Sequence, residues 1–139
     1  MSRKLRWPVF WALLAVFVIS VGFLFVPGLQ DLIHGPVIFV FFGLLLVLGV
    51  GLVVLAARDR TGGGLRRFFM LTGASAAGIL VFVLLHNLVY GLFEYFGGPD
   101  FWGSGDEPVF FILALIVCPL GFLVGAVGSI VTGARHRFS

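Results

Sequence analysis

Four long apolar runs alternate with short polar connections along the chain, and this pattern predicts four membrane-spanning helices. The runs cover approximately residues 8–26, 37–57, 68–93 and 109–132. The first run of about nineteen residues corresponds to about 28 Å of helix, which is close to the hydrocarbon thickness of a bilayer. We therefore expect an all-α integral membrane four-helix bundle, with residues 1–139 as one membrane domain.

The charged residues are divided between the two sides of the membrane. All nine basic residues stand at 3–6, 58–67 and 135–137, which four spans place on one side. Five of the six acids fall on the other side: Asp31, Glu94, Asp100, Asp106 and Glu107. Because Lys and Arg in short loops face the cytoplasm, we expect both termini to be cytoplasmic (N-in/C-in), in the inner (plasma) membrane of a cell.

The composition argues against a separate soluble domain. Hydrophobic residues make up 60% of the chain and charged residues 11%, compared with about a quarter charged in soluble domains. The net charge of +3 would suit nucleic acid, but its position beside apolar runs predicts the lipid bilayer as partner and no nucleic acid. The single cysteine, Cys118, excludes an internal disulfide and is expected to pack as a small hydrophobic residue.

The opening segment is predicted to be an uncleaved first span. A basic start followed by an apolar core resembles a signal peptide, but the run is longer and ends in Phe25-Val26-Pro27-Gly28, without a small-residue cleavage site. Pro8 is expected in the first turn of this helix, where its missing N–H costs nothing.

The third run is the only one with ionisable or amide side chains well inside it. On a helix of 3.6 residues per turn, Gly73, Ala77, Asn87 and Gly91 share one stripe. Small residues let helices approach closely, and an amide can hydrogen-bond across the contact, so this stripe predicts a helix-packing seam. His86 points about 100° away from Asn87 on the same helix.

The fourth run carries a second packing pattern, with small residues at Gly121, Gly125 and Ser129. We expect the third and fourth spans to form the tightest contact of the bundle through these small residues. Pro119 predicts a kink, because it removes a backbone hydrogen bond. Asp106 and Glu107, followed by Pro108, predict the helix start.

The candidate ligand-binding residues are His86, Asn87, Tyr90 and Glu94, at the outer end of the third span. His86 lies about 27 Å from the inner end of its helix, and an ionisable residue inside a span is a functional hypothesis. A neutral imidazole hydrogen-bonded to a neighbouring helix is the alternative. A metal site of His86, Glu94, His34 and a loop acid is conceivable, but the spacings typical of metal sites are absent. We expect no metal, haem or other cofactor.

The sequence gives little support for a catalytic or a transport function. Cys118 has no histidine nearby in sequence, and no catalytic dyad is present, so no catalytic residue is assigned. The inner half of every span lacks acids, lysines and arginines, which disfavours an ion path. The Gly-rich loop 58–67 lacks the Lys-Ser/Thr of a nucleotide-binding loop and is expected to contact anionic lipid headgroups.

The patterns Gly73–Gly78, Leu85–Tyr90 and Pro119–Ser129 are similar to a group of uncharacterised small four-pass bacterial membrane proteins. The resemblance covers the C-terminal half and implies a bacterial inner membrane and a role for His86 and Asn87, without an activity. The favoured hypothesis is a non-enzymatic structural, accessory or subunit role, in a homo-oligomer or larger membrane complex. The alternative is a small-ligand, metal or ion-handling protein with an outer-leaflet pocket around His86, and a membrane enzyme comes third.

Overall fold

The computed structural model describes residues 2–32, 35–60, 62–103, 105 and 107–138, and the chain is 86% helical, with no strand in these segments. Four helical spans are long and apolar enough to cross a membrane, so the chain is an all-α, multi-pass membrane protein. The helices are α1 (Ser2–Phe25), α2 (Pro36–Ala57), α3 (Gly64–Gly97), α4 (Pro108–Ile112) and α5 (Cys118–Phe138), with a short 3₁₀ helix η1 (Gln30–Leu32) after α1 and a π-helical turn η2 (Leu113–Val117) that joins α4 and α5 into one span.

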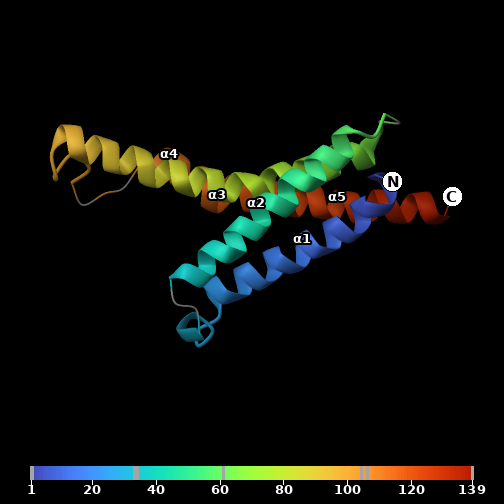
Figure 1. The fold of residues 1–139 in the computed structure, drawn as a ribbon, viewed down its shortest axis with the longest axis horizontal. Helices are drawn as coiled ribbons and strands as arrows, with labels where there is room; N and C mark the ends of the chain where they lie inside the picture. The colour runs from blue at the N-terminus through green and yellow to red at the C-terminus, as the bar shows by residue number, and fades with distance from the viewer. Residues whose placement is uncertain (1, 33–34, 61, 104, 106, 139) are drawn as a thin grey trace.

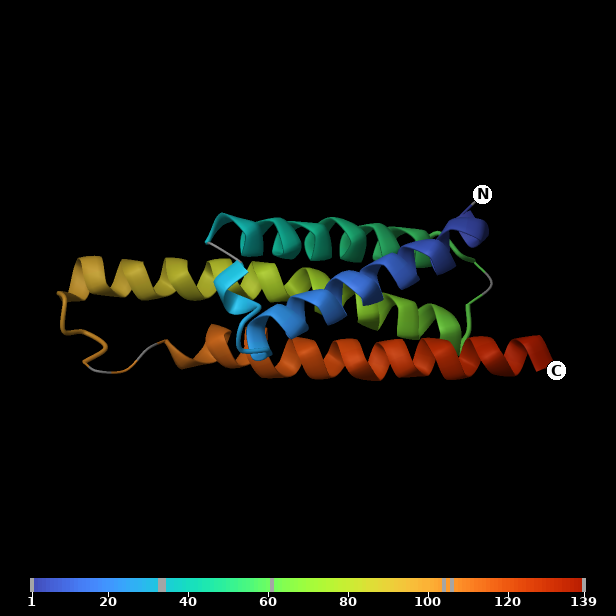
Figure 2. The same cartoon turned by 90° about the horizontal axis from the view of Figure 1, so that it is seen from below.

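The chain runs back and forth through the bundle. Figures 1 and 2 show both termini and the α2–α3 connection at one end, and the α1–α2 and α3–α4 connections toward the other. We call the first the basic end, because it carries residues 3–6, 58–67 and 135–137, and the second the acidic end, because it carries Asp31, Glu94, Asp100 and Glu107. The predicted separation of charges is therefore present in the fold.

Helix α3 is the central element of the bundle. It packs along both α2 and α5, while α1 packs mainly on α2. With 34 residues, α3 is about 51 Å long, whereas the 22 residues of α2 reach only about 33 Å. The α3–α4 hairpin therefore extends past the α1–α2 hairpin at the acidic end, and the two hairpins diverge there (Figure 1).

Three helices continue past the predicted apolar runs at the basic end. Helix α1 begins at Ser2, α3 begins at Gly64, and α5 continues to Phe138. The prediction that Pro8 occupies the first turn is wrong, because Pro8 lies inside α1. The added turn places Arg6 beside Asp59, at 2.6 Å, and Trp7 against Phe69, with ring centroids 5.2 Å apart. Hydropathy marks the lipid-facing length of a helix, whereas these contacts decide where α1 begins.

Helix α3 makes close contacts on two of its faces, one toward α2 and one toward α5. On the face toward α2, a Cβ added to Gly49 would lie 2.6 Å from the carbonyl oxygen of Gly73. On the face toward α5, a Cβ added to Gly125 would lie 2.7 Å from the backbone nitrogen of Thr72. The third and fourth spans do pack closely through Gly121 and Gly125, as expected, whereas the seam that contains Gly73 packs on α2 rather than on the fourth span.

Aromatic side chains fill the space between α1 and the α3–α5 pair. Phe10 and Phe69 are fully buried, with ring centroids 5.5 Å apart. Phe17 of α1 stacks on Phe122 of α5, with centroids 3.9 Å apart. These contacts hold the hairpins together along their basic half and leave them free to diverge toward the acidic end.

The fourth span starts where its sequence predicts, and its helix is irregular just before Pro119. The carboxylate of Glu107 accepts hydrogen bonds from the backbone N–H groups of Val109 and Phe110, and Pro108 follows as the first helical residue. Asp106 lies outside the described residues. The irregularity expected at Pro119 takes the form of the π-helical turn just before it, in which the N–H of Cys118 donates to the carbonyl of Leu113.

Candidate ligand pocket at the acidic end

A histidine on α3 meets a carboxylate at the start of the fourth span. His86 Nδ1 lies 3.0 Å from Glu107 Oε2. Only 15% of the His86 side chain and 4% of the Glu107 side chain are exposed. The pair therefore joins two spans at the acidic end, which corresponds to the alternative of an imidazole that is hydrogen-bonded to a neighbouring helix.

The pKa of Glu107 results from opposing effects. Burial acts to raise its pKa, but the hydrogen bond with His86 and those from the N–H groups of Phe110 and Val109 outweigh burial, so the pKa of this carboxyl lies below its ordinary value of 4.5. Positive charge on His86 acts in the same direction. Glu107 is therefore a carboxylate at neutral pH, and it also interacts favourably with the positive end of the α4 dipole.

Tyr90 and Glu94 form a second polar pair, one and two turns beyond His86. The Tyr90 hydroxyl donates to Glu94 Oε1 at 2.8 Å. Trp102, from the connection after α3, stacks on the Tyr90 ring and donates its indole N–H to the Tyr90 carbonyl at 3.3 Å. An indole is typical of the membrane–water interface, so this contact indicates that Tyr90 lies near the headgroup level.

Asn87 and Gly91 lie apart from these pairs. The Asn87 side chain is exposed and donates to the Val83 carbonyl of its own helix at 2.8 Å. A Cβ added to Gly91 would meet nothing within 4 Å. The expectation that Asn87 hydrogen-bonds across a helix contact is therefore wrong within the described chain. The other packing candidates do lie at contacts: Gly73 and Ala77 against Gly49, Gly121 against Ser75, Gly125 against Thr72, and Ser129 fully buried.

An apolar cavity of about 380 Å³ lies between the diverging hairpins. All four spans contribute to its wall, including Phe17 and Ser20 from α1, Phe42 from α2 and Ile79 from α3. The Ser20 hydroxyl donates to the Val16 carbonyl, so it adds little polarity. The cavity is thus shaped to hold an apolar group inside the bilayer.

His86 stands beside this cavity. A smaller hollow of about 160 Å³ is lined by His86 and Phe111, together with three residues that also line the larger cavity: Val83, Ala114 and Leu115. Ala114 and Leu115 belong to the π-helical turn η2, and such turns are frequent at functional sites. The arrangement places one polar, ionisable pair at the margin of an apolar space.

The metal hypothesis gains no further ligands from the fold. Among the described residues, no group of three or more His, Cys, Asp or Glu side chains could hold a metal ion. Glu94 is hydrogen-bonded to Tyr90, and His34 and Asp106 lie outside the described residues. Of the proposed metal ligands in the described part of the chain, the structure therefore brings the loop acid Glu107 to His86 but not Glu94.

Two residues of this region were missing from the predicted ligand-binding set. Glu107 was expected to start the fourth helix and was one of the loop acids considered for a metal site with His86, and Trp102 was not among the candidates. The depth of His86, near the outer end of its span, places it at the level where the fourth span begins, and this signal could have identified Glu107. Comparison of the chain with protein-family models, with curated proteins and with solved structures found no match.

Proposed function

We propose that the protein is a non-enzymatic structural or accessory subunit of a membrane assembly, in the inner membrane of a cell with both termini in the cytoplasm. The observation that carries this proposal is an exposed surface on α3 where an amide and a glycine lie among leucines: the Asn87–Gly91 face, made of Leu84, Asn87, Leu88 and Gly91. All four residues are exposed. The position of the basic residues at the end with both termini supports the orientation.

The Asn87–Gly91 face has the properties of a contact between chains. One Asn87 N–H donates to Val83, which leaves the second N–H and the amide oxygen available to a partner helix. Gly91 permits a close backbone approach, as Gly49 and Gly73 do inside the bundle. A second copy of the chain, or another membrane subunit, would satisfy the amide and cover the glycine.

Native mass spectrometry of the protein, extracted from its own host in a mild detergent, tests this proposal. A mass that fits several 15.1 kDa chains, or one chain with another polypeptide, is expected. Asn87→Leu and Gly91→Leu should reduce the assembled fraction. Gly51→Leu is the matched control, because Gly51 is also a helical glycine with nothing within 4 Å of an added Cβ. A bare monomer, or an assembly insensitive to both α3 variants, would contradict the proposal.

A second candidate function is the binding of a small amphiphilic molecule, and the cavity beside His86 favours it. An apolar body would occupy the space between the hairpins, and a polar head would reach the His86–Glu107 pair. A ligand that binds only the folded state raises the melting temperature, with a stabilisation of about 2.7 kcal/mol at a hundredfold excess over Kd. A screen of metals and small amphiphiles by thermal shift therefore tests this function.

The neighbouring residue provides the control for this second candidate. His86→Ala should abolish a ligand-dependent shift, whereas Asn87→Ala should preserve it, because Asn87 points away from the cavity and is exposed. If no compound raises the melting temperature, or if both variants respond alike, the cavity has no ligand that depends on His86.

A further inference from the structure

The basic end contains a charged cavity of about 490 Å³ where four parts of the chain meet. Its wall combines α1, the α2–α3 connection, the first turn of α3 and the last turns of α5, through Arg6, Asp59, Gly62, Gly63, Leu65, Arg66 and His136. The cavity is distant in the fold from the His86–Glu107 pair, since it lies at the opposite end of the bundle.

Two arginines bring unsatisfied donors to this cavity. Only 10% of the Arg6 side chain is exposed, and its Nη1 donates to Asp59 Oδ2. The Nε–H groups of Arg6 and of Arg66 are both buried, and neither has an acceptor within the described part of the chain. Buried donors are nearly always paired, so the described residues do not supply all the acceptors that these two guanidinium groups require.

The start of α3 adds a third source of positive potential. Gly62 and Gly63 adopt φ angles of +64° and +97°, which favour glycine, and they lead directly into the helix. Among the described residues, no side chain caps this helix, and no acid stands in its first turn. The first N–H groups of a 34-residue helix therefore carry the positive end of its dipole at the wall of the cavity.

Within the described part of the wall, the basic groups outnumber the acids. Asp59 is the one acid among the cavity-lining residues, and it is already bound to Arg6. From these contacts we infer that the cavity binds a phosphate group, held by Arg6, Arg66 and the N-terminus of α3. Guanidinium groups and helix N-termini are the two protein elements best suited to phosphate oxygens. Asp59 is a positioning residue that holds Arg6 in place.

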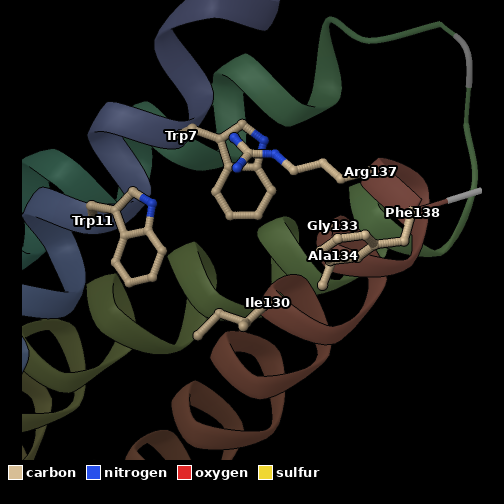
Figure 3. A pocket seen from close by; sticks show the side chains of 7 residues that line it. All are labelled: Trp7, Trp11, Ile130, Gly133, Ala134, Arg137 and Phe138. Atoms are coloured by element: carbon tan, nitrogen blue, oxygen red, sulfur yellow. The ribbon is translucent and has the colours of Figure 1, made fainter.

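The phosphate could belong to a lipid headgroup or to a soluble phosphate compound, and the neighbouring surface favours the lipid. Figure 3 shows a second cavity at this end, of about 230 Å³, between Trp7 and Trp11 of α1 and the end of α5. Arg137 extends from α5 toward Trp7 in this view. Arg6 and Trp7 both contact the Phe69 ring, so a lipid phosphate at Arg6 would place its glycerol backbone near interfacial indoles.

The experiment compares two neighbouring arginines. Arg66 lines the cavity, whereas Arg67 is exposed and is absent from its wall. In nanodiscs of phosphatidylcholine with added phosphatidylglycerol, native mass spectrometry should detect phosphatidylglycerol retained on the wild-type protein and on Arg67→Gln. Arg66→Gln should retain roughly tenfold less, as expected for the loss of one charge-assisted contact. General attraction to an anionic surface would weaken equally in both variants, and this result would overturn the inference.

Thermal shift with two probes distinguishes the sources of the phosphate. Stabilisation by phosphatidylglycerol but not by inorganic phosphate assigns the cavity to a lipid headgroup, and stabilisation by inorganic phosphate assigns it to a soluble compound. The double variant Arg6→Gln/Asp59→Asn removes both charges of the buried ion pair together and should lose either shift. If it is folded by circular dichroism and keeps the shift, or if the wild-type protein responds to neither probe, the phosphate site is refuted.

Discussion

Arg6 Nη1 donates to Asp59 Oδ2 at 2.6 Å, although 53 residues separate the two in the chain. Both side chains are about nine-tenths buried. The contact joins the start of α1 to the connection between α2 and α3, and so it closes the basic end of the bundle. It also orients the guanidinium that contributes to the phosphate site inferred above.

Loss of one member of this ion pair should destabilise the fold strongly. Asp59→Leu leaves the Arg6 charge buried without its carboxylate, and we expect the free energy of unfolding to fall by about 3 kcal/mol. Unfolding by sodium dodecyl sulfate in mixed micelles measures this change. The double variant Arg6→Met/Asp59→Leu should recover most of the loss, and Asp31→Asn, at an exposed acid on η1, should have almost no effect. A single variant as stable as the wild-type protein would contradict the prediction.

The His86–Glu107 contact predicts a ranking of two substitutions. His86→Ala removes one hydrogen bond between the third and fourth spans and should lower the melting temperature modestly. Glu107→Ala removes that bond and also the N-cap of α4, so its melting temperature should fall further. Asp31→Asn is the control, since Asp31 is an exposed acid on η1 at the same end of the bundle. The opposite ranking would show that Glu107 does not hold the start of the fourth span.

The pKa of Glu107 predicts a loss of stability in acid. Because this pKa is lower in the folded protein than its ordinary value, the carboxylate contributes stability that is fully present above about pH 4.5 and is lost as the pH falls through the folded pKa. The melting temperature in detergent, measured from neutral pH downward, should decrease below that point. The curve of Glu107→Gln should be flatter over the same interval, and two parallel curves would exclude Glu107 as the source.

The contact of Gly125 with Thr72 predicts a steric effect. A Cβ at Gly125 would lie 2.7 Å from the Thr72 nitrogen and 3.0 Å from its Cα, and backbone cannot move away as a side chain can. Gly125→Leu should therefore lower the free energy of unfolding by at least about 2 kcal/mol, through separation of α3 and α5. Gly51→Leu should leave unfolding in mixed micelles nearly unchanged, because nothing lies within 4 Å of its Cβ. If both variants lost a similar amount of unfolding free energy, the cause would be a general effect of leucine and not the contact with Thr72.

The sequence by itself determined the membrane class, the four spans and the division of charge between two ends. These features depend on local hydropathy and on the order of elements, and both can be read along the chain. The start of the fourth span was also predictable, because Glu107 and Pro108 act on the backbone next to them. The packing of Gly125 followed from the spacing of small residues, which fixes a common helix face.

Only the tertiary structure decided which distant side chains meet. The partner of His86, the burial of Arg6 and the contact of Gly73 with Gly49 depend on how each helix is rotated about its axis and tilted against its neighbours. Hydropathy is nearly uniform around the helices of this chain and cannot specify that rotation. Because α3 is longer than the α1–α2 hairpin, the two hairpins diverge at the acidic end. Stacked rings such as Phe17 and Phe122 hold them together toward the basic end.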